Sequence, residues 1–149
     1  MEDGSLGYYR VPEGVAIHVV DTEDAAVRFE EALSAACVVG LDAEWKPREG
    51  GGRKGKPPPA ALLQVACRGQ GKDVIFLLDI LQQPRIFTSV IQGLLRNKDI
   101  VKVGFHVMSD LQALARGLGG DGQAAVAIVD PYVDASSLRL WARRPGGGR

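Results

Sequence analysis

The 149-residue sequence has little cysteine, no long hydrophobic run and no excess of charge of either sign. Its two cysteines, Cys37 and Cys67, lie in apolar runs, which favours free thiols in a reducing compartment over a disulfide framework. No apolar stretch approaches the roughly 18 residues that a membrane span needs, so we expect no membrane partner. The first residues are acidic and include no apolar segment, which predicts an intracellular protein of the nucleus or cytoplasm that is not secreted.

Eighteen basic and eighteen acidic residues cancel, so net charge gives no sign of a nucleic-acid partner, and any such signal has to be local. Hydrophobic residues make up 46% of the chain, which is typical of a globular protein and too high for a chain that is disordered as a whole. The length suits one domain. We expect an irregular lead-in over residues 1–14, a domain over 15–138, and a disordered or non-native tail over 139–149.

Apolar periodicity predicts an α/β fold whose two halves differ. The expected strands are 15–20, 38–45, 60–67, 73–80, 100–105 and 124–129. The expected helices run from Asp21 or Thr22 to about Ala36, from Pro84 through Leu95, and from His106 to about Leu118. Strands 38–45, 60–67 and 73–80 are joined by loops and predict an antiparallel meander, with the nearly continuous apolar strand 73–80 in a central place. The later alternation predicts parallel strands with crossover helices, and Asp130 and Asp134 are assigned to the turn after the last strand.

Two carboxylates stand near the end of one predicted strand. Side chains alternate along a strand, so Asp42 and Glu44 lie on the same face. Two neighbouring carboxylates repel, and a divalent cation such as Mg²⁺ is a natural partner for their oxygens. A strand whose polar end emerges into a loop would place the same two residues without any metal.

A basic segment follows the acidic pair. Residues 46–59 contain three consecutive glycines and three consecutive prolines, which exclude regular structure. Their basic residues are Lys46, Arg48, Arg53, Lys54 and Lys56. Such a loop is either an arm for the phosphates of a nucleic acid or the solvated tip of a hairpin, and the sequence favours neither.

A third carboxylate, Asp110, lies in the first turn of the helix that follows the strand 100–105. An isolated aspartate at this position would act as a helix cap. The strand–glycine–helix context instead aims it at the end of the sheet where Asp42 and Glu44 lie.

These segments resemble a known family. Gly40-Leu41-Asp42-Ala43-Glu44-Trp45 is similar to the first motif of the DEDD 3′–5′ exonucleases, in particular the group of ribonuclease D and the Werner exonuclease. Leu62-Leu63-Gln64-Val65-Ala66 resembles the strand that follows in that group, and Lys102-Val103-Gly104-Phe105 through Asp110-Leu111 resembles its second motif. The resemblance implies a ribonuclease-H-like mixed sheet over roughly residues 15–138.

The resemblance also implies a chemistry. In the family two ions, Mg²⁺ or Mn²⁺, are held by four carboxylates, and nucleoside monophosphates are released from the 3′ end of RNA or DNA. Asp42 would bridge both ions, Glu44 would bind one and orient the water or the 3′ end, and Asp110 would bind the other. Gln64, Trp45 and Phe105 are candidate contacts of the terminal nucleotide, although packing of Trp45 in the core is an equally open reading.

One motif of the family is missing from this sequence. The family's third motif, Tyr-x-x-x-Asp or His-x-x-x-x-Asp, supplies the fourth carboxylate and a base, and these 149 residues contain no such segment. We therefore expect a C-terminally incomplete domain, such as a truncated isoform, with weakened or no exonuclease activity. The alternative is a non-catalytic nucleic-acid-binding or regulatory module that uses the basic loop.

Overall fold

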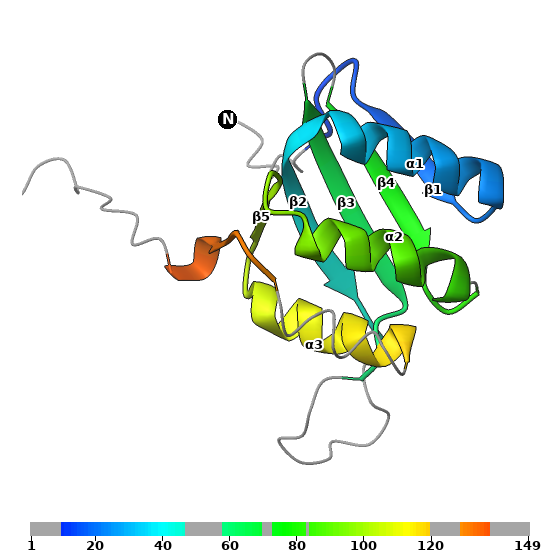
Figure 1. Cartoon of the computed structure of the whole chain (residues 1–149), viewed down its shortest axis with the longest axis vertical. Coiled ribbons are helices and arrows are strands. Elements are labelled where there is room, and N and C mark those ends of the chain that lie inside the picture. The colour runs from blue at the N-terminus through cyan, green and yellow to red at the C-terminus, as the bar shows by residue number, and fades with distance from the viewer. Residues whose placement is uncertain (1–9, 47–57, 70–72, 83, 120–128, 138–149) are drawn as a thin grey trace, which may run out of the picture.

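The computed structural model describes residues 10–46, 58–69, 73–82, 84–119 and 129–137 (Figure 1). Within them a six-stranded mixed sheet has the order β1-β4-β3-β2-β5-β6. The strands are β1 (Ala16–Val20), β2 (Ala36–Glu44), β3 (Leu62–Gly69), β4 (Val74–Asp79), β5 (Val101–Gly104) and β6 (Tyr132–Asp134). Strand β3 runs antiparallel to β2 and β4, whereas the pairs β1–β4, β2–β5 and β5–β6 are parallel. The predicted meander followed by parallel strands is confirmed.

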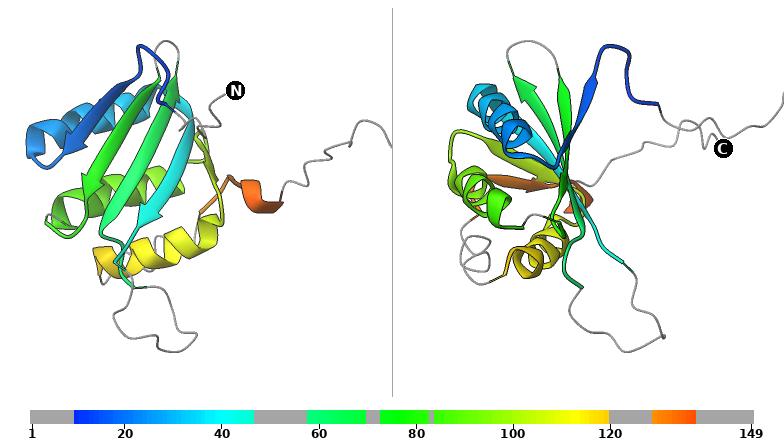
Figure 2. Two further views of the ribbon diagram at one scale, coloured as in Figure 1. Left: turned by 180° about the vertical axis from the view of Figure 1, so that it is seen from behind. Right: turned by 90° about the vertical axis from the view of Figure 1, so that its right-hand side faces the viewer.

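Three helices cover one face of this sheet, as the rear view and the side view in Figure 2 show. They are α1 (Glu23–Ala35), α2 (Pro84–Arg96) and α3 (Val107–Leu118). Thr22 caps α1, because its side-chain oxygen accepts a hydrogen bond of 3.3 Å from the backbone N–H of Ala25. No helix in the described part of the chain has both the length and the apolar character needed to span a membrane.

Strand β2 lies in the middle of the sheet and its burial alternates. Val39, Leu41 and Ala43 are buried in the core beneath the helices, whereas Asp42 and Glu44 are exposed. Because successive side chains of a strand point to opposite faces, the two acids lie on the face that the three helices leave open. The prediction that they share a face is confirmed.

The assignment of Asp134 to a turn is wrong. Tyr132–Asp134 form the edge strand β6 rather than part of a turn, and they pair in parallel with Lys102–Gly104 of β5. Val133 is β-branched and lies opposite Val103, which suits a short strand at the edge of a sheet. The predicted strand 124–129 lies almost wholly outside the described residues. Strand β4 is interior, between β1 and β3, but the two middle positions belong to β3 and β2.

Lys102 is a fully buried lysine in β5. Its ammonium group donates hydrogen bonds to the backbone carbonyl of Asn97, just beyond α2, and to that of Asp130, at 3.4 Å. Burial lowers the pKa of Lys102, and the charge of Asp130 opposes that change. One side chain thus joins the end of α2 to the segment that leads into β6.

Lys102→Met should lower the free energy of unfolding by roughly 1–3 kcal/mol, because two carbonyl groups lose their donor while the volume of the side chain is nearly kept. Urea unfolding followed by circular dichroism measures this change. Lys98→Met, which alters an exposed lysine in the preceding turn, is the matched control and should have almost no effect. A Lys102→Met variant as stable as the wild type would show that the cost of burying the ammonium group outweighs its two hydrogen bonds.

Candidate functional site

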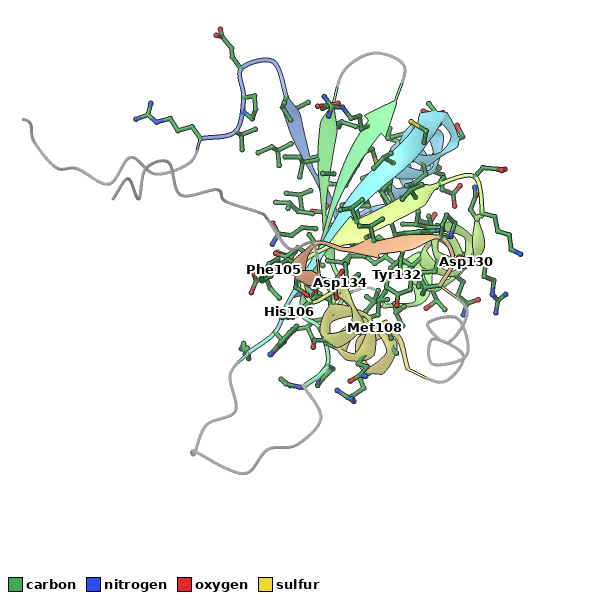
Figure 3. The ribbon with its side chains drawn as sticks, turned by 90° about the vertical axis from the view of Figure 1, so that its left-hand side faces the viewer. Phe105, His106, Met108, Asp130, Tyr132 and Asp134 are labelled. Atoms are coloured by element: carbon green, nitrogen blue, oxygen red, sulfur yellow. The ribbon has the colours of Figure 1, made fainter. Side chains whose placement is uncertain are left out.

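The candidate site lies at the edge of the sheet where parallel strands end together. Asp42 and Glu44 are near the carboxyl end of β2, and Asp134 is the last residue of β6. His106 lies in the turn between β5 and α3, and Figure 3 shows it beside Phe105 and Asp134, whereas Asp130 lies toward the other end of β6. Asp110 is in the first turn of α3, as predicted. The carboxyl edge of parallel strands is where α/β folds generally place their ligands.

Asp110 is the carboxylate most withdrawn from water, with only 8% of its surface exposed. Its Oδ2 atom is buried and has no hydrogen-bond partner in the described part of the chain. Burial, followed by the negative charges of Asp42 and Glu44, raises the pKa of Asp110 to about 6. Asp134 adds a smaller rise, while His106 opposes it. Asp42 and Glu44 therefore both lie close enough to Asp110 to disfavour its negative charge.

Asp42 is held by a neighbour on the next strand. Gln64 is its register partner in β3, and the Gln64 amide nitrogen donates a hydrogen bond of 3.2 Å to Asp42 Oδ2. Gln64 had been predicted only as a contact of the nucleotide. Its observed contact fixes the orientation of a carboxylate.

The two aromatic candidates have different environments. Trp45 is half-buried and packs against the hydrophobic core, which favours the packing role. Phe105 is 65% exposed and makes an edge-to-face contact with His106, with ring centroids 4.7 Å apart. Phe105 is thus the ring that is open to a stacking partner. The basic candidates Arg53, Lys54 and Lys56 lie outside the described residues.

The sequence predictions missed the roles of His106 and Asp134. Asp134 Oδ1 accepts hydrogen bonds from the His106 backbone N–H at 3.1 Å and from the Ser136 N–H and hydroxyl at 2.9 and 2.6 Å. The contacts with Ser136, and then the one with His106, lower the pKa of Asp134. Asp134 ends a short apolar segment, as Asp42 lies near the end of the apolar strand β2, and this pattern could have marked it as a site residue. The assignment of Asp134 to a turn is the reason that it was missed.

The residues present suit a cation, although their side chains are not preassembled around one position. In the described ranges no three histidine, cysteine, aspartate or glutamate side chains converge as ligands of one ion. A buried carboxylate oxygen without a partner, next to two further carboxylates, nevertheless lacks the positive charge that would stabilise it. Carboxylate oxygens are the ligands that Mg²⁺ and Mn²⁺ prefer.

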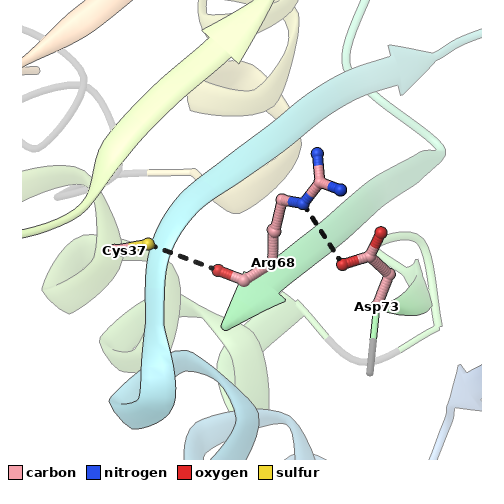
Figure 4. A network of polar contacts seen from close by, with 3 residues as sticks. All are labelled: Cys37, Arg68 and Asp73. Carbon is pink, nitrogen blue, oxygen red and sulfur yellow. Dashed lines mark hydrogen bonds and ion pairs between the residues drawn. The ribbon is translucent and has the colours of Figure 1, made fainter. Parts of the chain in front are cut away.

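A separate polar network lies where β2 begins and β3 ends, at the far end of these two strands from Asp42 and Glu44 (Figure 4). The Cys37 thiol donates to the Arg68 carbonyl at 3.7 Å, and Arg68 Nε lies 3.5 Å from Asp73 Oδ1. Both cysteines are free, as predicted. Burial raises the pKa of Cys67 to about 11, so this thiol is not poised for reaction.

Residues 17–140 match the model of a protein family described as 3′-5′ exonuclease. The chain belongs to this 3′–5′ exonuclease family, of the DEDD type. Its sequence is 35% identical over 117 residues to the human exonuclease mut-7 homolog, a match that covers 72% of this chain and 13% of that protein.

Solved structures of exonucleases share the fold of this exonuclease domain. Trypanosoma brucei RNase D in complex with RNA U12 matches with a TM-score of 0.65 at 24% identity, covering 81% of this chain and 38% of that one. The EXO domain of Aedes aegypti Nibbler matches with a TM-score of 0.59 at 18% identity, covering 85% of this chain and 55% of that one. The predicted ribonuclease-H-like α/β fold is confirmed, and the chain spans well under two thirds of the length of these relatives.

Asp110→Asn should make the exonuclease domain more stable near pH 7.5 by about 1–3 kcal/mol when divalent ions are chelated. The pKa of Asp110 is raised from 3.8 to about 6, so the folded state holds this proton more tightly than the unfolded state does. The resulting stability is complete below about pH 4 and is lost as the pH rises through about 6. The variant, which stays neutral, avoids that loss.

Urea unfolding at about pH 4 and about pH 7.5 measures this difference, which should shrink toward the lower pH. Asp99→Asn, at an exposed position in the turn before β5, is the control. The same change in stability at both values of pH would contradict the electrostatic explanation.

Proposed function

We propose that this exonuclease domain hydrolyses phosphodiester bonds from the 3′ end of a nucleic acid, with Mg²⁺ or Mn²⁺ held by Asp42, Glu44 and Asp110. The observation that carries the proposal is the buried, unpartnered Oδ2 of Asp110 beside two other carboxylates. Membership of the exonuclease family supports the reaction, and the preference of carboxylates for hard divalent cations supports the cofactor.

Divalent ions held by Asp42, Glu44 and Asp110 would supply a more acidic water and would stabilise the charge on the leaving 3′-oxygen, as the pair of ions does in the family. The protein's own part is to hold ligands and substrate. Gln64 keeps one oxygen of Asp42 in a fixed orientation, so that the exposed carboxylate reorganises less on binding. Because the pKa of Asp110 is raised to about 6, its carboxylate gains ligand character as the pH rises through that value.

Phe105 is the proposed platform for the terminal base. Its ring is exposed, is steadied by the contact with His106, and lies beside the carboxylate edge. Stacking on an aromatic ring tolerates any base, which suits an enzyme that removes nucleotides in succession. The basic loop 46–56 is a further proposed contact, for phosphates.

The catalytic rate is proposed to be low. These 149 residues contain neither form of the family's third motif, and a positioned base alone contributes about 10²–10⁴ to a rate. A second candidate function is binding of nucleic acid without cleavage, favoured by the exposed Phe105 ring and by the five basic residues in the sequence of residues 46–56. The two free thiols suit a reducing intracellular compartment.

Calorimetric titration with Mn²⁺ should show saturable binding that is lost in Asp42→Ala. The substitution removes one of the proposed ligands from the exposed face of β2 without touching the core. Asp99→Ala, which removes an exposed carboxylate elsewhere, should bind like the wild type. Absence of binding in a folded wild-type chain would reject the metal site.

Degradation of 3′-labelled RNA and DNA then separates the two candidate functions. Hydrolysis should be slow, should need Mn²⁺ or Mg²⁺, and should stop in chelator and in Asp42→Ala. Binding that persists in chelator, weakens with salt and falls in the double variant Lys54→Ala/Lys56→Ala, with no cleavage, would favour the binding module. Rapid metal-dependent degradation would contradict the proposed low rate.

A further inference from the structure

The turn between β5 and α3 has an unusual backbone. His106, the N-terminal cap of α3, has a φ of 57°, in the left-handed region, and its side chain makes no capping hydrogen bond. A residue with a Cβ atom is sterically disfavoured in this region, so surrounding contacts must hold it there. One such contact, from a distant part of the chain, is the hydrogen bond that the His106 N–H donates to Asp134.

The same turn determines where Asp110 lies. The Ser109 N–H donates to the His106 carbonyl at 2.9 Å, which begins the helix, and Asp110 follows directly in the first turn. The direction of that turn is therefore set at His106. Asp134, from the edge strand β6, accepts the hydrogen bond from the backbone N–H of His106. Its negative charge also lies near the start of α3, where the helix dipole favours it.

The turn has little room to adjust. A Cβ atom at Gly104 would lie 3.0 Å from the carbonyl oxygen of Leu41 in β2 and 3.0 Å from the side chain of Val107 in α3. Strand β5, strand β2 and the helix thus touch at this point, one residue from Asp42. This packing leaves the end of β5 little room to shift if the conformation of His106 changes.

We propose that Asp134 is a positioning residue: its carboxylate fixes the His106 turn and thereby aims Asp110 at the site formed with Asp42 and Glu44. This rests on the proposed metal-dependent function. It adds a residue of β6 that the family motifs quoted above do not include. Asp134 acts through the backbone of His106, so the oxygen acceptor matters to this role and the negative charge matters much less.

Three variants separate this role from others. Asp134→Ala removes both the acceptor and the charge, Asp134→Asn keeps an acceptor oxygen, and Ser136→Ala removes a neighbouring donor but leaves the contact with His106. We expect the Mn²⁺ affinity to fall about tenfold or more in Asp134→Ala and to stay within about threefold of the wild type in the other two. Far-UV circular dichroism checks that each variant is folded.

Two outcomes of this titration overturn the proposal. If Asp134→Asn loses as much affinity as Asp134→Ala, then Asp134 is itself a ligand or acts through its charge. If Asp134→Ala binds Mn²⁺ like the wild type, the carboxylate only supports the short 3-10 turn at Ala135–Ser137. A loss of affinity in Asp134→Ala that Asp134→Asn restores supports the positioning role.

A second measurement is independent of any metal. Amide hydrogen exchange by NMR should show the His106 N–H exchanging at least about tenfold faster in Asp134→Ala, and at nearly the wild-type rate in Asp134→Asn. If the wild type binds no Mn²⁺, the proposed function fails, and the exchange data still decide whether Asp134 holds the turn. Unchanged exchange at His106 in Asp134→Ala would overturn the proposal even if metal binding were found.

Discussion

The alternation of β2 is the constraint on which the rest of this domain depends. Val39, Leu41 and Ala43 are buried beneath the helices, and this leaves Asp42 and Glu44 no place except the open face. A slip of one residue would bury two carboxylates and expose three apolar side chains, so the register is strongly specified. The pairing with β3 then follows, and it brings Gln64 opposite Asp42.

The candidate site combines two environments that differ in their exposure to water. Asp42 and Glu44 face solvent from the end of a strand, while Asp110 is nearly enclosed in the first turn of α3. Ionisation of an exposed carboxylate requires little free energy, whereas ionisation of a buried carboxylate without a partner is unfavourable. The fold thus retains an unfavourable group at the position where a cation would relieve the cost, which is typical of functional sites.

Much of this arrangement could be predicted from the sequence because it depends on local patterns. The strand over Ala16–Val20, the helix capped by Thr22 and the helix that starts at Pro84 all have clear apolar periodicity or capping signals. The site carboxylates could be placed at one edge because parallel strands end together. The sharing of a face by Asp42 and Glu44 needed only the two-residue period of a strand.

What could not be predicted depends on contacts between distant segments. Strand β6 has three residues, too few for a period, and it exists because β5 offers it an edge. The hydrogen bond between His106 and Asp134 joins residues 28 positions apart in the sequence. No local sequence pattern predicts such a contact or the left-handed conformation of His106. Whether Trp45 faces substrate or core was likewise open until the packing of the helices was known.

The two cysteines differ in a way that is useful at the bench. Cys37 is exposed near the start of β2, whereas Cys67 is buried and its pKa is raised to about 11. Since the thiolate is the reactive form, a maleimide dye or spin label at neutral pH should attach at Cys37 alone. The domain therefore has a single natural attachment point, at the end of β2 remote from Asp42 and Glu44, from which a probe can report on the carboxylate edge without obstructing it.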